Sequence, residues 1–265
     1  MNSSRARDII IIGAGGVATS MALALRSAGH RIVQVYSRTG ESARRLAERV
    51  EAEAVTSVDE IRRDAELCVV SLTDSALVEL APQLVEGRAS MLFAHTAGSI
   101  AMDVLPTSRR GVFYPMQTFS RSRVVDFSNV PLFIEASQPD DLQLLKDVAE
   151  SISPKVVPLS SEGRQYLHVA AVFCSNFVNH CYAQAASLLA ERGVDFDVML
   201  PLIDEVARKV HSVPPRQAQT GPAVRRDFDV VRRQTEMLPE GSYARAIYEL
   251  MSQSIIRCSD DLKNE

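Results

Sequence analysis

A cluster of glycines directly after four consecutive isoleucines is the part of the chain whose residue types point most directly to chemistry. The order predicts a buried strand, a tight turn and a helix, as the phosphates of a dinucleotide require. Gly13 would permit the turn, Gly15 would let the backbone approach the pyrophosphate, and Ala18 would let the helix pack closely on the strand. Free N–H groups at the start of the helix would attract the phosphates. The alternative is an ordinary strand–helix turn of an α/β protein. The residues expected to contact the phosphates are Gly13, Ala14, Gly15, Gly16, Val17 and Ala18.

Ser37 and Arg38 follow the next predicted strand, residues 31–36. Sites that select NAD place an Asp or Glu at this point, against the ribose 2′-hydroxyl, and this sequence has no acid there. A hydroxyl followed by a guanidinium suits a 2′-phosphate, to which arginine can present two parallel donors. We therefore expect NADP(H) rather than NAD as the cofactor. The alternative is that both residues belong to a surface turn.

Polar residues also follow two further predicted strands, residues 67–72 and 90–94. The carboxyl ends of parallel strands meet at one edge of a sheet, where a bound dinucleotide would pass. His95 with Thr96 could hydrogen-bond the nicotinamide ribose or the substrate, although a histidine at a strand end can equally be a structural residue. The residues expected beside the cofactor here are Ser71, Leu72, Thr73, His95, Thr96 and Gly98.

A long helical pattern, residues 162–193, carries polar side chains on one stripe of an otherwise apolar helix. At about 100° per residue, His168, Ser175 and Asn179 share that stripe, with Asn176 beside it. Unpaired, such groups would cost on the order of 1–3 kcal/mol each if buried, so they either join helices in a core or face a ligand. We favour the ligand and assign these four residues to catalysis. His168 is the expected proton donor or acceptor, because the usual histidine pKa suits neutral pH.

Two other segments supply candidate substrate contacts. Gln117 follows a predicted strand, and Thr220 opens a Thr-Gly-Pro turn into a helix whose first turn would hold Arg225 and Asp227. For Thr220, Arg225 and Asp227, the alternative explanation is that they cap the helix and form an ion pair.

Strands alternate with helices up to about residue 160, which predicts a parallel doubly wound sheet of the α/β class. Beyond it the pattern is helical throughout, so we expect two domains, residues 1–160 and 161–265, with the substrate in the cleft between them. The further predicted strands are residues 111–115, 130–136 and 155–159, and the predicted helices are residues 41–50, 76–84, 142–151, 162–193, 196–210, 222–237 and 242–258.

Composition narrows the class of protein. The 265 residues carry a net charge of −4, which gives no reason to expect nucleic acid as a partner. No apolar run is long enough to cross a membrane. The four cysteines form no CxxC pair, which favours free thiols in the cytoplasm and no metal site. Apolar residues on more than one face of residues 166–189 predict a homodimer through the helical domain.

Five short motifs along the chain together carry a resemblance to a known family. They are Gly13-x-Gly15-x-x-Ala18, His95-Thr96-x-Gly98-Ser99, Tyr114-Pro115-Met116-Gln117-Thr118-Phe119, Ser175-Asn176-Phe177 and Thr220-Gly221-Pro222-x-x-Arg225-x-Asp227. With them the chain resembles, over nearly its whole length, the Rossmann-like family with a DUF2520 C-terminal domain, often labelled as NADP or F420-dependent oxidoreductases. More distantly it is similar to pyrroline-5-carboxylate reductase, ketopantoate reductase and the 6-phosphogluconate dehydrogenase group, which implies a helical second domain of that kind.

The chain departs from these relatives at two points. Gln234 stands where the resemblance leads us to expect a histidine, and no lysine occurs between Lys155 and Lys209, so the catalytic lysine of β-hydroxyacid dehydrogenases is absent. The resemblance implies a fold and a cofactor but supplies no substrate.

The leading hypothesis is an NADP(H)-dependent oxidoreductase that moves a hydride to or from a small polar carbonyl, imine or hydroxyl substrate. Two alternatives stay open. One is a nucleotide-binding sensor without turnover, which the missing lysine favours, and the other is an oxidoreductase that uses F420.

Overall fold

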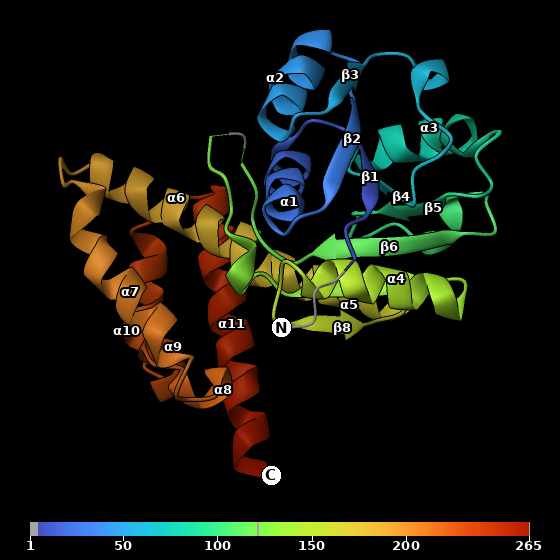
Figure 1. The fold of residues 1–265 in the computed structure, drawn as a ribbon. Helices are drawn as coiled ribbons and strands as arrows, with labels where there is room; N and C mark the ends of the chain where they lie inside the picture. Colours follow the sequence, from blue (N-terminus) through green and yellow to red (C-terminus); the bar gives the residue numbers. More distant parts are fainter. Residues whose placement is uncertain (1–4, 121, 265) are drawn as a thin grey trace. The chain divides into compact units, whose positions relative to one another are not determined.

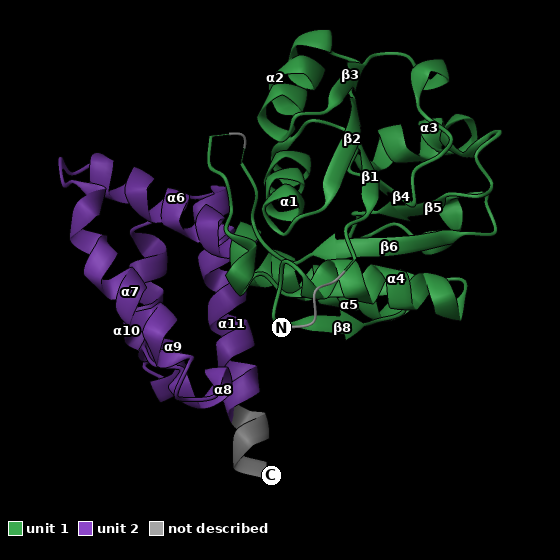
Figure 2. Ribbon diagram, in the orientation of Figure 1, with its two compact units in different colours: residues 1–176 green, residues 177–265 purple. Residues whose placement is uncertain are grey.

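The computed structural model describes residues 5–120 and 122–264. By its internal contacts the chain divides into two compact units, residues 1–176 and 177–265 (Figure 2). The last strand ends at Pro158 and a helix begins at Ser161, so the change from alternating strands to helices occurs where the sequence predicts it. The compact units divide later, because the first helix after the sheet packs within the first unit.

The first unit contains one eight-stranded sheet in the order β3-β2-β1-β4-β5-β6-β7-β8 (Figure 1). The order in which strands are added to the sheet reverses between β1 and β4, which lie side by side and parallel. In doubly wound folds the ligand binds at this point. The strands are β1 (Asp8–Ile12), β2 (Arg31–Tyr36), β3 (Glu53–Val55), β4 (Leu67–Val70), β5 (Leu92–His95), β6 (Arg110–Pro115), β7 (Leu132–Ala136) and β8 (Val156–Pro158).

The predicted parallel sheet is confirmed except at one point, where β7 runs antiparallel to β6. A parallel pairing needs a crossover connection, usually a helix. The described part of the connection from β6 to β7 holds only a short 3-10 turn, Phe127–Asn129, so β7 returns beside β6 in the opposite direction. The short β3 was also missing from the prediction.

Helices cover both faces of the sheet. Alternate isoleucines of β1 pack into two separate apolar clusters, one with α1, α2 and α4 and the other with α3. All four isoleucines are fully buried, as expected of a central parallel strand. The helices of this unit are α1 (Gly16–Ser27), α2 (Gly40–Val50), α3 (Asp74–Val85), α4 (Pro139–Glu150) and α5 (Ser161–Val172).

The predicted uninterrupted helix of residues 162–193 is wrong in its middle. After α5, residues Phe173–Phe177 form a π-helical segment, and α6 (Val178–Ala190) follows it. A π turn closes its hydrogen bonds over five residues instead of four, so it holds one residue more than an α turn. The Ser175 hydroxyl donates to the Ala171 carbonyl at 2.8 Å within this stretch.

The second unit contains only helices among its described residues. Residues 196–210, predicted as one helix, form a 3-10 turn (Phe196–Met199) and α7 (Leu200–Lys209). Residues 222–237 are divided at Arg226, whose φ of 58° interrupts the helix. The remaining helices are α8 (Pro215–Ala218), α9 (Pro222–Arg225), α10 (Phe228–Glu236) and α11 (Tyr243–Asn264).

No helix of the described chain is long and apolar enough to cross a membrane. The second unit buries few of its apolar side chains: among its described residues only Ala223 and Leu238 belong to the buried apolar set.

Candidate functional site

The turn after β1 shows why a glycine is needed at its first position. Gly13 has a φ of +108°, and a Cβ there would lie 2.1 Å from the carbonyl oxygen of Ser71. The Ser71 N–H in turn donates to the Ile12 carbonyl at 2.7 Å. The loops after β1 and β4 therefore lie directly against each other at the reversal of strand order, where Ser71, Leu72 and Thr73 were expected.

The backbone at Gly15 is open, as the approach of a pyrophosphate would require. A Cβ on Gly15 would meet no atom within 4 Å, so the backbone is open on that side. Gly15 is also the N-cap of α1 and supplies no side-chain hydrogen bond to the first turn. The first N–H groups of α1 are thus left for a ligand such as phosphate. Ala18 is buried in the core, as its predicted packing role requires.

Ser37 and Arg38 lie at the end of β2, directly before α2. The Arg38 side chain is exposed, and it lowers the pKa of the neighbouring Tyr36, although burial raises that pKa by more. The Ser37 hydroxyl accepts a hydrogen bond from the Thr39 N–H at 3.3 Å. Thr39, the N-cap of α2, makes no side-chain cap, so a guanidinium, a hydroxyl and a helix N-terminus are available together for a phosphate.

His95 has a structural environment that differs from its predicted contact with the cofactor. Its side chain is 0% exposed. Nδ1 accepts from the Ala97 N–H at 3.2 Å, and Nε2 lies 3.3 Å from the Ala101 carbonyl oxygen. Burial, together with the charge of Arg164, lowers the pKa of His95 to about 4, so the ring is neutral. Both ring nitrogens hold the loop after β5, so the predicted hydrogen bond from the ring to the nicotinamide ribose has no free nitrogen to make it.

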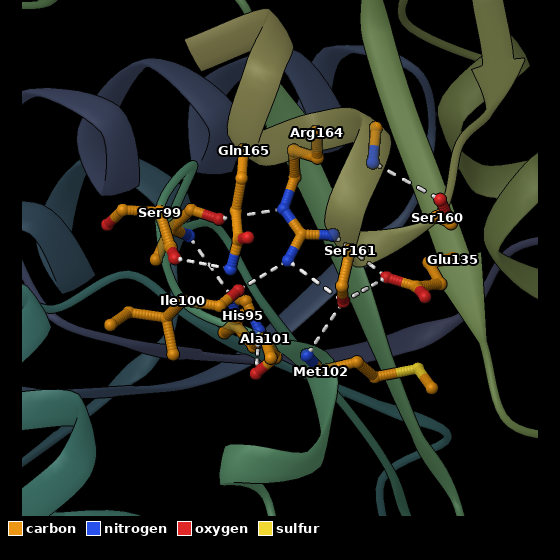
Figure 3. A network of polar contacts seen from close by, with 12 residues as sticks. His95, Ser99, Ile100, Ala101, Met102, Glu135, Ser160, Ser161, Arg164 and Gln165 are labelled. Carbon is orange, nitrogen blue, oxygen red and sulfur yellow. Dashed lines mark hydrogen bonds and ion pairs between the residues drawn. The ribbon is translucent and has the colours of Figure 1, made fainter. Parts of the chain in front are cut away.

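Arg164 on α5 is the centre of a buried polar network that the sequence did not indicate (Figure 3). Its side chain is fully buried and forms an ion pair with Glu135 of β7 at 2.8 Å. It also donates to the carbonyl oxygens of Ala97, at 3.2 Å, and of Ile100. The loop that carries Gly98 is therefore fastened to α5 and to the sheet at once.

The same loop contacts His168, one helical turn beyond Arg164. A Cβ on Gly98 would lie 2.4 Å from His168 Nδ1, so only glycine leaves room for the ring. The hydroxyl of Tyr114, from β6, lies 3.0 Å from the same nitrogen. His168 thus lies between the loop after β5 and the end of β6. Tyr114 was not among the predicted site residues, since nothing in its spacing distinguishes it from a core tyrosine.

Tyr114 and His168 line a cavity of about 500 Å³ within the first unit. Three predicted site residues line it too: Gln117 after β6, and Ser175 and Asn176 in the π-helical segment. The side-chain oxygen of Gln117 accepts a hydrogen bond from the Thr118 N–H at 2.8 Å, so the side-chain NH₂ is the part left to bind a ligand. Among the described residues, the lining includes no lysine, arginine, aspartate or glutamate.

Asn179 is not among the residues that line this cavity. It lies beyond the π-helical segment, in the second unit, and is exposed. The expected stripe assumed a constant 100° per residue, and the wider π turn shifts every later residue away from it.

The substrate contacts predicted near residue 220 belong to the second unit. The carboxylate of Asp227 accepts from the Val230 N–H at 3.2 Å and so caps α10, in agreement with the capping alternative. Thr220 and Arg225 are exposed. Thr220 lines a separate cavity of about 400 Å³, whose lining lies entirely within the second unit.

Protein-family models match two stretches of the chain, and the second stretch begins within the first compact unit. Residues 2–117 match the Rossmann-like domain, and residues 130–255 match the domain of unknown function DUF2520. A comparison with curated proteins finds no match.

Solved structures resemble the chain over almost its whole length. A protein from Bacteroides fragilis named "putative NADP oxidoreductase" is 51% identical, with a TM-score of 0.89 over 97% of this chain and 100% of its own. A protein from Thermotoga maritima is 21% identical, with a TM-score of 0.81 over 95% and 99%. An imine reductase from Myxococcus stipitatus in complex with NADP+ is 14% identical, with a TM-score of 0.68 over 97% and 94%, and shares the fold. The chain belongs to the family in which a Rossmann-like domain is joined to a DUF2520 domain.

Proposed function

We propose that the protein is an NADP(H)-dependent oxidoreductase acting on a small substrate with a polar carbonyl, imine or hydroxyl group. The observation that carries the proposal is the contact of His168 with Gly98. It joins the strand-end loop expected beside the nicotinamide to the cavity lined by Tyr114, Gln117 and Asn176. A titratable ring at the border of two such sites is what a hydride-transfer enzyme needs for the accompanying proton.

The cofactor would be held by three features of the first unit. These are the open backbone at Gly15, the uncapped start of α1, and the pair of Ser37 and Arg38 before α2. When bound, NADPH would donate a hydride to the substrate in the reductive direction, and NADP+ would accept one from the substrate in the oxidative direction. The name of the relative that is 51% identical supports this choice of cofactor.

The residues of the cavity would orient the substrate and handle its proton. His168 is the proposed proton donor or acceptor. Gln117 and Asn176 carry amide NH₂ groups that can donate to a carbonyl oxygen, an imine nitrogen or a hydroxyl oxygen. The single hydroxyl hydrogen of Ser175 can be donated either to the Ala171 carbonyl, at 2.8 Å, or to the Asn176 side-chain oxygen, at 3.0 Å, and in the second case Ser175 holds Asn176. We retain Asn179, Thr220, Arg225 and Asp227 only as candidates, because they belong to the second unit.

We further propose a cytoplasmic homodimer that associates through the helical unit. All four cysteines are free thiols, in keeping with a reducing compartment.

Large apolar side chains of α7 and of the turn before it are exposed at helical spacing, namely Val198, Leu202 and Val206. Contiguous exposed apolar surface marks an interaction site. The negative net charge favours neither nucleic acid nor an anionic membrane surface as a partner.

The test is NADPH oxidation with a panel of ketones and cyclic imines, for the unaltered protein and for His168→Ala. We expect turnover with at least one compound and a loss of about 10²–10⁴-fold in kcat for the variant, the usual contribution of a general acid or base. His211→Ala, an exposed histidine of the second unit, is the matched control. NADPH binding with no turnover by any compound would instead favour the sensor.

A further inference from the structure

We propose that Tyr114 is a positioning residue that makes neutral His168 a hydrogen-bond donor at Nε2, so that the substrate group bound there is a hydrogen-bond acceptor. A carbonyl oxygen or an unprotonated imine nitrogen meets that requirement. An ammonium or iminium group, which can only donate, does not. The inference rests on the proposed function in taking the cavity of Tyr114 and His168 as the substrate site.

The two side chains meet with defined geometry. The Tyr114 hydroxyl lies 3.0 Å from His168 Nδ1, and the rings stand edge to face, with centroids 6.0 Å apart and planes at 76°. Tyr114 is 8% exposed and belongs to β6, which is paired on both sides, with β5 and β7. The hydroxyl is therefore a fixed partner for the ring.

The direction of this hydrogen bond follows from the acidity of the two groups. Burial raises the pKa of Tyr114 above its usual value of 10, so the phenol keeps its proton at neutral pH. A phenol is a stronger donor than a neutral imidazole N–H, and an imidazole nitrogen is a stronger base than a phenol oxygen. No other acceptor of the Tyr114 hydroxyl occurs among the described residues. The hydroxyl therefore donates to Nδ1, and the imidazole hydrogen lies on Nε2.

Gly98 limits the position of the ring from the other side. Its missing side chain leaves space that His168 Nδ1 occupies, since a Cβ would lie only 2.4 Å away. Arg164 fixes the loop that carries Gly98 through the carbonyls of Ala97 and Ile100. Figure 3 shows Arg164 beside Ile100. The ring therefore packs directly against this loop and cannot move further toward it.

Nε2 is thereby left as the free donor of the pair. It has no hydrogen-bond partner among the residues that the structure describes, and His168 lines the cavity. A donor at the wall of a ligand cavity is satisfied by water or by an acceptor of the ligand. The neutral ring can polarise a carbonyl through this hydrogen bond without losing its proton. It delivers a proton from Nε2, as the proposed function requires, only when the imidazole is protonated on both nitrogens.

The first experiment is ¹⁵N NMR of the histidine side chains in the ligand-free protein, at a pH where His168 is neutral, with His168→Ala to assign its signals. We expect a single tautomer with hydrogen on Nε2 and a mixture of tautomers in Tyr114→Phe. Tyr166→Phe, an exposed tyrosine on the same helix, is the control and keeps the single tautomer. Hydrogen on Nδ1 in the unaltered protein, or an unchanged tautomer in Tyr114→Phe, would overturn the proposal.

A second variant keeps the test decisive if Tyr114→Phe does not fold. Gly98→Ala displaces the ring from the hydroxyl and leaves Tyr114 in place, so it should also yield mixed tautomers. Adding cyclopentanone should shift the Nε2 signal, whereas cyclopentylammonium at pH 8 should not. Equal shifts from both compounds would contradict the acceptor requirement.

The activity readout separates this inference from the proposed function. In Tyr114→Phe, kcat should fall roughly tenfold, as for one lost hydrogen bond, with KM changed less. The absence of turnover in the unaltered protein refutes the function and leaves the tautomer result standing. A fixed Nε2–H tautomer with unchanged kcat in Tyr114→Phe would refute the positioning role alone.

Discussion

Two glycines of one turn are needed for different reasons. Gly13 is required by the folded protein itself, because its φ is +108° and Ser71 occupies the space of a side chain. Gly15 has ordinary backbone angles and open space around it, so it is required only by what binds there. Replacing each of these glycines by alanine should therefore separate an effect on folding from an effect on cofactor binding.

Gly13→Ala should lower the free energy of unfolding by about 2 kcal/mol or more, from backbone strain and the clash with Ser71. Gly15→Ala should cost less than about 1 kcal/mol, since it changes only an N-cap. It should nevertheless weaken NADPH binding, because the new methyl group lies where the pyrophosphate would approach. Urea unfolding and a fluorescence titration of NADPH measure the two effects. Unchanged NADPH affinity in Gly15→Ala would contradict the cofactor site.

The preference for NADPH should depend on Arg38. Arg38→Ala removes one charge-assisted contact with the 2′-phosphate and should weaken NADPH binding by roughly tenfold to a hundredfold, with little effect on NADH. Arg49→Ala, an exposed arginine near the other end of α2, is the control. Equal affinity of the unaltered protein for NADPH and NADH would exclude the assignment of Ser37 and Arg38.

The loop after β5 depends on a histidine that must stay neutral. The pKa of His95 is about 4 in the folded protein and near 6.5 in the unfolded chain. The unfolded chain therefore binds more protons between pH 6.5 and 4, so stability falls on acidification through this window. The total loss is about 3 kcal/mol at 1.36 kcal/mol per pKa unit. The pKa of His30 is also lowered, mainly by burial, so this group further reduces the free energy of unfolding as the pH falls.

His95→Asn should reduce this dependence on pH. Urea unfolding measured at several values between pH 7 and 4 gives the slope, whatever the variant costs at neutral pH. His211→Asn, on an exposed histidine, should keep the slope of the unaltered protein. An identical slope in His95→Asn would mean that the buried ring is not the group that titrates.

The sequence predicted the elements that local patterns determine. The turn at Gly13, the buried β1 and the alternation of strands and helices follow from hydrophobic periodicity and glycine placement. The antiparallel direction of β7 and the π-helical segment have no periodic signal in the sequence, because apolar periodicity distinguishes a strand from a helix but gives neither strand direction nor one wide turn. Arg164 reads as a surface arginine in a helix until its partner Glu135, 29 positions away in the chain, is known. Tyr114 was missed because its partner His168 is 54 positions away in the chain. Asn179 was placed on the wrong stripe because the π turn changes the phase of the helix.

The second unit leaves many of its large apolar side chains exposed. Val198, Leu202 and Val206 are each 59% exposed, and few apolar residues of this unit are buried. A helical unit stabilises itself mainly by burying an apolar face, so a second copy of the chain is the partner we expect.

Light scattering should give twice the 29.1 kDa mass of the chain at micromolar concentration. The double variant Leu202→Glu and Val206→Glu should shift the protein to monomers, because it places carboxylates in the proposed interface. Val78→Glu, on a valine of α3 that is 55% exposed, is the matched control and should stay dimeric. A monomeric mass for the unaltered protein would refute the dimer.

The π-helical segment has a consequence for how such chains can be aligned. One wide turn absorbs an extra residue, so α6 continues in the phase that an uninterrupted helix would reach with one residue fewer. A deletion within residues 173–177 would therefore restore regular α-helix without rotating α6. It would alter only the stretch that lines the cavity with Ser175 and Asn176. Between relatives that differ here, a one-residue gap would mark a change of the cavity wall and not a change of fold.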